Sequence, residues 1–298
     1  MIKPITPGQK RQITGFAGLA TEAVLEELGL TSEQAQRVVR AGAECQERMR
    51  EQFRSIVMEL ATPEEYASEE VPSNYGYLSG YRQPRTLLEQ ANRLKELFPE
   101  LRGALYDDRF ASEPRPKGAE GHFILLDWRQ LGETYADAYK KVFGKVREVY
   151  GGNAVNYLER EGKLTEKHLR ESAAKRSAME RIREAQKGHD FLVVAGQFGH
   201  LHRGRSVRRA RAVMQDSGQF GFGLFESLIL LLTHPDRLRH YDDLWIDCAG
   251  DEISWNGDGQ VTDAPYVGFH GGMLKVLANG VGSPYDYYGS VSGFSPQS

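Results

Sequence analysis

The residues best suited to chemistry lie in a glycine- and arginine-rich turn after an apolar run. The run DFLVVAG, residues 190–196, leads into QFGHLHRGRSVRRAR. Glycines let backbone amides face a ligand, and the start of a helix carries partial positive charge. Guanidinium groups add forked donors that suit phosphate or carboxylate. We therefore predict an anion-binding site within residues 196–209, formed by Gly199, Arg203, Gly204, Arg205, Ser206 and Arg208.

This turn matches neither of the common nucleotide-binding fingerprints. Its glycine spacing differs from the P-loop pattern G-x-x-x-x-G-K-[ST] and from the dinucleotide pattern G-x-G-x-x-G. The expected ligand is therefore an anionic small molecule or a nucleic acid, and the sequence identifies no cofactor. Ser206 is expected to cap the helix beneath the bound anion.

A second set of candidate groups is acidic and lies at the ends of apolar runs. Asp127 lies at the end of HFILLDW, and Asp247 and Asp251 lie in LWIDCAGDE. Carboxylates beside a histidine can hold a divalent metal ion or supply a general base. Asp127, Asp247 and Asp251 are the candidate catalytic residues, and His202, Asp247 and Asp251 are the candidate metal ligands. If their strands run parallel, Asp127 and Asp247 share one edge of the sheet.

Internal ion pairing is the simpler interpretation of the same charges. Residues 242–273 contain no Lys or Arg, and this acidic stretch can neutralise the basic turn across neighbouring strand ends. The two interpretations differ in one geometric respect. Either Arg205 and Arg208 contact Asp247 and Asp251, or they line an open cleft.

The elements that position these groups alternate between strand and helix. Apolar runs at HFILLDW, NAVNYLE, DFLVVAG and LWIDC are separated by helical segments, which predicts parallel pairing through right-handed crossovers. PYVGFHGGMLKVL predicts a hairpin that turns at Gly271 and Gly272. The predicted fold class is α/β, with a mainly parallel sheet flanked by helices, an N-terminal helical region and a C-terminal antiparallel hairpin.

Residues 1–120 are predicted to be a helical region with a tyrosine-rich loop, and 121–298 the α/β domain. FAGLATEAVLEELGL and the run from Ser32 to Ala61 place apolar residues at helical spacing, which is typical of packing or of a homo-oligomer formed through these helices. The tyrosines of residues 62–82 are expected to attach that loop to its own domain. Proline, glycine and charge in ASEPRPKGAEG predict a linker, which places the domain boundary near residue 120.

Composition excludes several classes of protein. With 298 residues, 40% apolar and 27% charged, the chain is typical of a soluble globular protein. A net charge of -3 argues against a dedicated nucleic-acid protein but allows a local basic face. The two cysteines form no C-x-x-C pair, so a reduced, cytoplasmic chain is expected. The sequence has no apolar run of signal-peptide or membrane-spanning length, so no membrane association is expected.

The C-terminal half of the chain resembles a recurring family of uncharacterised bacterial proteins associated with small-genome candidate phyla. The resemblance covers roughly residues 150–298 and rests on QFGHLHRGRSVRRAR, LLTHPDRL, DDLWIDCAGDE and YGSVSGFSPQ. It implies no reaction, cofactor or catalytic residue. Three functions therefore stay open, of which binding of an anionic or phosphorylated ligand is preferred. The alternatives are a metal-assisted hydrolase and an assembly protein without a catalytic site.

Overall fold

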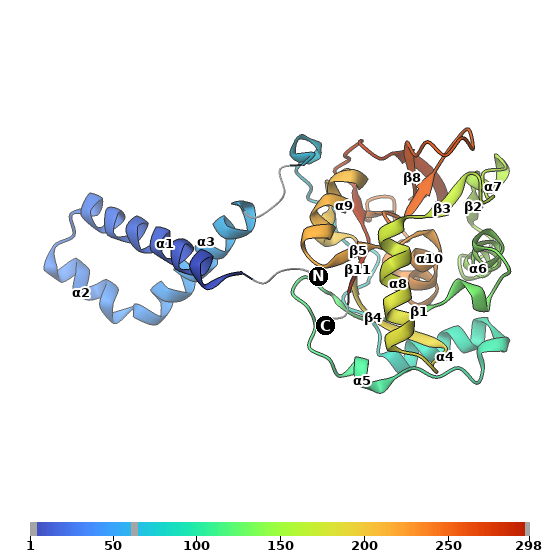
Figure 1. Cartoon of the computed structure of the whole chain (residues 1–298), viewed down its shortest axis with the longest axis horizontal. Helices are drawn as coiled ribbons and strands as arrows, with labels where there is room; N and C mark the ends of the chain where they lie inside the picture. The colour runs from blue at the N-terminus through green and yellow to red at the C-terminus, as the bar shows by residue number, and fades with distance from the viewer. Residues whose placement is uncertain (1–4, 61–64, 296–298) are drawn as a thin grey trace. The chain divides into compact units, whose positions relative to one another are not determined.

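The structure, a computed structural model, describes residues 5–60 and 65–295. The chain divides into two compact units, Met1–Glu64 and Glu65–Ser298 (Figure 1). The boundary expected near residue 120 falls inside the second unit, because the residues from Glu65 onward contact the sheets described below. Each unit is described by itself.

The first unit, here called the arm, has three helices within residues 5–60. They are α1 (Pro7–Leu28), α2 (Ser32–Arg40) and α3 (Gly42–Leu60). Thr6 and Thr31 cap α1 and α2 through capping boxes, and Gly29 ends α1 in the left-handed conformation, at φ 52°. The single long helix expected after Thr31 is interrupted at Ala41, so α2 and α3 are separate helices.

The second unit contains two sheets. In the four-stranded sheet the order is β1-β4-β11-β5 and every pairing is antiparallel. Its strands are β1 (Gly121–Leu126), β4 (Phe191–Gln197), β5 (Gln219–Gly221) and β11 (Ser292–Phe294).

The seven-stranded sheet is mixed. Its main order is β10-β6-β8-β7-β3, and β9 joins β8 to β2. Among the strand pairs of this sheet that the structure describes, β10–β6 and β2–β9 are parallel and the others are antiparallel. The expected hairpin is present between β8 and β9, with Gly271 and Gly272 at φ 61° and 74°. The strands are β2 (Ala154–Asn156), β3 (Leu169–Glu171), β6 (Trp245–Asp247), β7 (Asp251–Ile253), β8 (Asp263–His270), β9 (Met273–Gly280) and β10 (Tyr288–Ser290).

The prediction of one mainly parallel sheet is therefore wrong. Two strands joined by a helix form a right-handed parallel crossover only when both strands belong to the same sheet. Here α6 (Tyr135–Val149) connects β1 of the four-stranded sheet to β2 of the seven-stranded sheet. β4 pairs with β1 in the antiparallel direction. Alternation along the chain predicts β1, β2, β4 and β6 as strands, but it specifies neither their partners nor the short strands β3, β5, β7, β10 and β11.

The core lies around α10 (Leu224–Thr233), all of whose residues are buried. This helix contacts β1, β8, α4 (Leu87–Leu97) and α6, so it joins the two sheets (Figure 1). None of the described helices is both long and apolar enough to cross a membrane. The remaining helices are α5 (Asp108–Ala111), α7 (Tyr157–Arg160), α8 (Ala173–Ala185), α9 (Val207–Asp216) and the short 3-10 helices Ala67–Glu69, Pro99–Leu101, Trp128–Gln130, His200–His202 and Pro235–Arg237.

The tyrosine-rich loop is attached to the rest of the second unit by partly buried hydrogen bonds. The Asp243 carboxylate accepts hydrogen bonds from the backbone amides of Leu78 and Ser79, at 2.7 and 3.0 Å. The Glu120 carboxylate accepts hydrogen bonds from the hydroxyls of Tyr77 and Tyr81, at 2.6 and 2.9 Å. This loop therefore packs on its own unit, as its aromatic composition predicts.

Candidate functional site

The glycine- and arginine-rich turn connects β4 to α9 and packs against β10. Gly199 has a φ of 113°, and a Cβ at this position would lie 2.8 Å from the Gly289 carbonyl oxygen. Gly204 has a φ of 74°, and a Cβ there would lie 2.1 Å from the Val71 carbonyl oxygen. Both glycines are therefore required by close backbone contacts within the protein.

Ser206 caps α9, as expected, and an internal carboxylate occupies the position predicted for an anion. The Ser206 hydroxyl accepts from the Arg209 amide at 3.1 Å and donates to Glu69 Oε2 at 2.6 Å. Arg208 Nε lies 2.8 Å from both oxygens of Glu69. Hydrogen bonding from Arg208 lowers the pKa of the Glu69 carboxyl. The start of α9 thus binds a carboxylate of the same chain, at the position where the sequence predicts an external anionic ligand.

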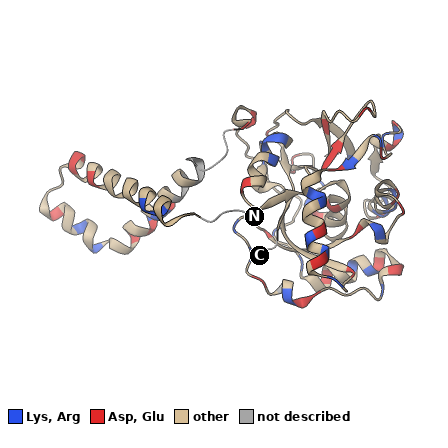
Figure 2. Cartoon of the chain, in the orientation of Figure 1, with Lys and Arg blue, Asp and Glu red and all other residues tan. Residues whose placement is uncertain are grey.

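Glu70 completes the neutralisation of the turn. It forms ion pairs with Arg205, at 3.3 Å, and with Arg209. Burial alone would raise the pKa of the Glu70 carboxyl, but the two guanidinium groups outweigh it and the pKa is lowered. The basic turn is therefore paired with the start of the tyrosine-rich loop. The ion pairs of Arg205 and Arg208 within the described part of the chain are with Glu70 and Glu69, not with Asp247 or Asp251 of the acidic stretch. Figure 2 shows both signs of charge around α9.

Arg203 and His202 take part in other internal contacts. Arg203 donates to the Tyr75 carbonyl at 3.0 Å and contacts His200 Nε2 at 2.9 Å. The His202 ring is fully buried between Gln219 Oε1, at 3.1 Å from Nε2, and Arg205 Nη1, at 3.1 Å from Nδ1. Burial, followed by the charge of Arg205, lowers the pKa of His202 to about 4. Both ring nitrogens are occupied, so this neutral imidazole is held as a structural group.

The three candidate aspartates lie in three different surroundings. Asp127 pairs with Arg129 at 3.0 Å and with Arg183 at 3.4 Å. It follows a strand of the four-stranded sheet, whereas Asp247 ends a strand of the seven-stranded sheet, so the expected shared edge does not exist. Among residues 5–60 and 65–295, no group of three or more His, Cys, Asp or Glu side chains is placed to hold a metal ion.

Asp251 belongs to a buried charge cluster around Lys175. The Lys175 ammonium lies 3.0 Å from Asp251, 2.6 Å from Glu226 and 3.3 Å from Glu171. Three carboxylates thus surround one buried cation, and they raise the pKa of Lys175 against the opposing effect of its burial. Burial raises the pKa of both Glu226 and Asp251.

Further hydrogen bonds fix this cluster in the core. The Tyr135 hydroxyl donates to Asp251 Oδ2 at 2.6 Å, and the Leu224 amide donates to the same oxygen at 2.7 Å. A Cβ at Gly223 would lie 2.2 Å from Asp251 Oδ1, so only glycine leaves room there. The sequence reasoning identified Asp251 but not its partners. The one available signal was Glu226, a lone charge in the apolar helix FESLILLL.

Asp247 differs from the other two aspartates because its carboxylate has no hydrogen bond or ion pair within the described part of the chain. Its side chain lies on the face of β6 that also bears Trp245, beside Tyr266 and Ser290 of the neighbouring strands. Burial raises the pKa of the Asp247 carboxyl to about 7, although the nearby charge of Arg211 opposes this. A buried, unpaired acid of this kind is typical of functional sites.

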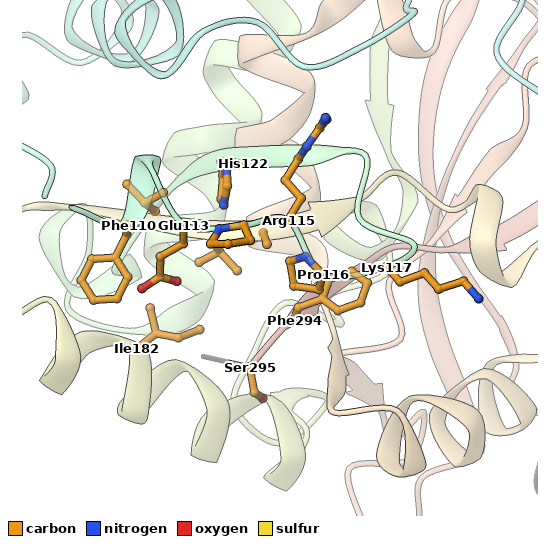
Figure 3. Close-up of a pocket in the computed structure, with 13 residues that line it drawn as sticks. Phe110, Glu113, Arg115, Pro116, Lys117, His122, Ile182, Phe294 and Ser295 are labelled. Atoms are coloured by element: carbon orange, nitrogen blue, oxygen red, sulfur yellow. The ribbon is translucent and has the colours of Figure 1, made fainter. Parts of the chain in front are cut away.

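A separate cavity of about 410 Å³ lies between the predicted linker, the four-stranded sheet and α8 (Figure 3). Phe110, His122, Ile182 and Phe294 contribute to its walls. In Figure 3 the Glu113 carboxylate points into the space, whereas Arg115 and Lys117 extend away from it. No site residue predicted from the sequence lines this cavity.

Comparison with known proteins adds no assignment to this geometry. No protein-family model, curated protein or solved structure matches the chain. The class of the protein therefore rests on its own fold: an α/β unit with two sheets and a separate helical arm.

Proposed function

We propose that the protein is an assembly protein and that two copies associate through the arm. The observation that supports this most strongly is the exposure of large apolar side chains on all three helices. Phe16 and Leu19 are each 67% exposed, and Val39 is 69% exposed. No residue of α1 or α2 is buried. The exposed set is Phe16, Leu19, Val24, Leu25, Leu28, Val38, Val39, Met49, Phe53 and Ile56.

The energy available from covering these side chains is large. Full burial of one such side chain contributes about 1.5–3 kcal/mol, so ten that are roughly half exposed represent on the order of 10 kcal/mol per copy. This is comparable to the whole stability of a typical domain, about 5–15 kcal/mol. Scattered apolar residues on a surface need no explanation, but ten on one small unit indicate an interface.

Charge complementarity favours a second copy of the chain as the partner. Lys10 and Arg11 lie near the start of α1, and Glu26 and Glu27 lie near its end. Figure 2 shows basic colour at the first end of this helix and acidic colour at the other. At 1.5 Å per residue these two groups are roughly 24 Å apart. An antiparallel pair of α1 helices therefore places opposite charges side by side at both ends, whereas a parallel pair opposes like charges.

Replacing Leu19 by glutamate is expected to convert the dimer to monomer, because it places a charge in the middle of the apolar face. Light scattering and sedimentation over a range of concentrations measure the mass. Leu105→Glu is the matched control, since Leu105 is 65% exposed but lies in the second unit. A wild-type chain that is monomeric at every concentration contradicts the proposal, and it would leave the second unit or another protein to cover the arm.

Charge reversal tests the antiparallel arrangement. The double variant Lys10→Glu, Arg11→Glu is expected to weaken association at least tenfold. Adding Glu26→Lys and Glu27→Lys to the same chain restores opposite charges at both ends and is expected to recover most of the affinity. If reversal has no effect, the antiparallel α1 pair is wrong.

A second candidate function is binding of an anionic ligand at the turn formed by residues 196–209. It is supported by the observation that Ser206 and Arg208 already bind one carboxylate, that of Glu69. An incoming phosphate must displace this side chain, so Glu69 limits the affinity of the site.

The variant Glu69→Gln is expected to bind inorganic phosphate at least tenfold more tightly than the wild type, because it removes the competing charge. Titration calorimetry at two salt concentrations measures this, and affinity is expected to fall as salt rises. The effect should be lost when Arg205→Ala is added. Glu252→Gln removes another partly buried carboxylate, the partner of Arg170, and serves as control. The absence of phosphate binding in Glu69→Gln would show that the arginines have only a structural role.

A further inference from the structure

We propose that Asp247 and Ser290 form a binding site for the primary ammonium group of an organic amine. This site lies on the seven-stranded sheet of the second unit, and it does not depend on association through the arm.

The register of three strands brings the site together. Asp247 of β6 is opposite Tyr266 of β8 and also opposite Ser290 of β10. Residues that are partners across neighbouring strands project to the same face of a sheet. Trp245 and Tyr288 are a further such pair, two residues earlier along their strands. One sheet face thus carries a carboxylate, a hydroxyl and three aromatic rings.

Both polar groups of the site lack partners. The Asp247 side chain is only 7% exposed, yet no described residue donates a hydrogen bond to its carboxylate or forms an ion pair with it. The Ser290 Oγ atom is fully buried and also has no hydrogen-bond partner in the described part of the chain. An unpaired, fully buried polar atom is rare because it costs free energy. Ser290 Oγ is such an atom, and it lies on the strand next to a slightly exposed carboxylate that also has no partner, so the pair points to a ligand that supplies the missing donors.

Arg211 does not supply the hydrogen-bond donors that Asp247 and Ser290 lack. Its guanidinium donates to the carbonyl oxygens of Ala249, at 2.8 Å, and Asp251, at 2.7 Å. This positions the connection between β6 and β7. Arg211 is close enough to oppose the rise in the pKa of Asp247, but the two side chains form no ion pair. The carboxylate is therefore available to another cation.

The aromatic rings favour a cation as the ligand. The ring of Tyr266 stacks on Trp245, with centroids 6.0 Å apart, and contacts the ring of Tyr288 at 5.0 Å. Tyr266 is half-buried, so this side of the site reaches solvent. Aromatic faces attract ammonium groups, and the attraction is strongest where water is excluded.

A primary ammonium group satisfies the site better than the alternatives. Its three N–H donors match the two carboxylate oxygens and the serine oxygen, and its charge neutralises Asp247. A neutral alcohol offers a single donor and leaves the charge unpaired. A quaternary ammonium has no N–H donor, and an anion is repelled by the carboxylate.

Titration calorimetry with ethylamine, putrescine and Nα-acetyl-lysine methylamide tests the proposal on the full chain. All three carry a primary ammonium group, and saturable binding of at least one is expected. Binding of ethylamine or putrescine indicates a small amine as the natural ligand, whereas binding confined to the lysine derivative indicates a lysine side chain. Tetramethylammonium and 1-butanol are expected to bind at least tenfold more weakly.

Variants connect this binding to the named residues. Asp247→Asn is expected to weaken amine binding at least tenfold, and Ser290→Ala several-fold. Asp242→Asn is the matched control, because Asp242 precedes the same strand but is exposed. Circular dichroism confirms that each variant is folded. If no amine binds the wild type, or if Asp247→Asn binds amines as tightly as the wild type does, the proposal is wrong.

Discussion

Replacing Lys175 by methionine is expected to lower the free energy of unfolding by about 3–5 kcal/mol at pH 7, because removing one partner of a buried ion pair leaves the other charged and unpaired. Lys175 is fully buried and lies within 3.3 Å of three carboxylates. Methionine preserves the approximate length of the side chain, so the decrease in the free energy of unfolding is caused by the lost charge and not by a change in volume. Urea denaturation measures the change.

Two further variants test whether the unpaired buried charge causes the loss of stability in Lys175→Met. Lys187→Met removes an exposed lysine paired with Glu184, and its effect is expected to be under about 0.5 kcal/mol. Adding Glu226→Gln to Lys175→Met removes one of the carboxylates that have lost their cation, and it is expected to recover part of the stability. A loss that the second substitution does not reduce would indicate that Lys175 contributes through packing alone.

Replacing Asp247 by asparagine is expected to stabilise the protein progressively as the pH rises. Burial raises the pKa of the Asp247 carboxyl from 3.8 to about 7, so the folded protein binds the proton more tightly than the unfolded chain. The wild type therefore loses stability as the pH rises from about 4 to 7. We expect the free energy of unfolding of the variant, relative to that of the wild type, to increase by about 2–3 kcal/mol between pH 5 and pH 8. This follows from about 1.36 kcal/mol for each unit by which the pKa is shifted.

The charged and titratable groups that face Asp247 do not reverse this loss of wild-type stability with rising pH. Arg211 from α9 lowers the pKa of Asp247, but burial has the larger effect. Tyr266 and Tyr288, from the two neighbouring strands, have raised pKa values and stay neutral over the same range. Asp258→Asn gives a control of opposite sign, because hydrogen bonding from the Gln260 amide lowers the pKa of the Asp258 carboxyl. A difference between Asp247→Asn and wild type that does not change with pH would show that Asp247 is not an unpaired buried acid.

The Asp247 result bears directly on function. A residue whose replacement increases stability but abolishes binding is maintained for its activity, since selection for stability alone would remove it. Asp247→Asn thus gives opposite expectations for stability and for amine binding in one variant. A purely structural residue would not show this combination.

Local features of the structure could be predicted from the sequence because their causes are local. Thr31 caps a helix, and Ser206 caps α9. Gly271 and Gly272 adopt the left-handed backbone that a two-residue hairpin requires. The apolar spacing in the arm predicts its helices, whereas the exposure of these apolar side chains is known only from the structure.

The partners of the charged groups could not be predicted in the same way. Arg208 pairs with Glu69, which lies 139 positions away at the start of the tyrosine-rich loop. The sequence suggested the nearer acidic stretch, because proximity along the chain was the only available guide. Ser290 gave no signal beyond its place in YGSVSGF, and Lys175 reads as an ordinary exposed residue of a charged helix.

The sequence by itself determined the strands β1, β2, β4 and β6, the β8–β9 hairpin with its glycine turn, and which side chains carry charge at strand ends. It did not indicate the short strands β3, β5, β7, β10 and β11. The tertiary structure alone decided that the strands divide between two sheets, that the basic turn binds an internal carboxylate, and that Asp247 is buried without a partner. The physical reason is that helix caps and turns depend on residues a few positions apart, whereas strand pairing, ion pairing and burial depend on contacts between distant segments.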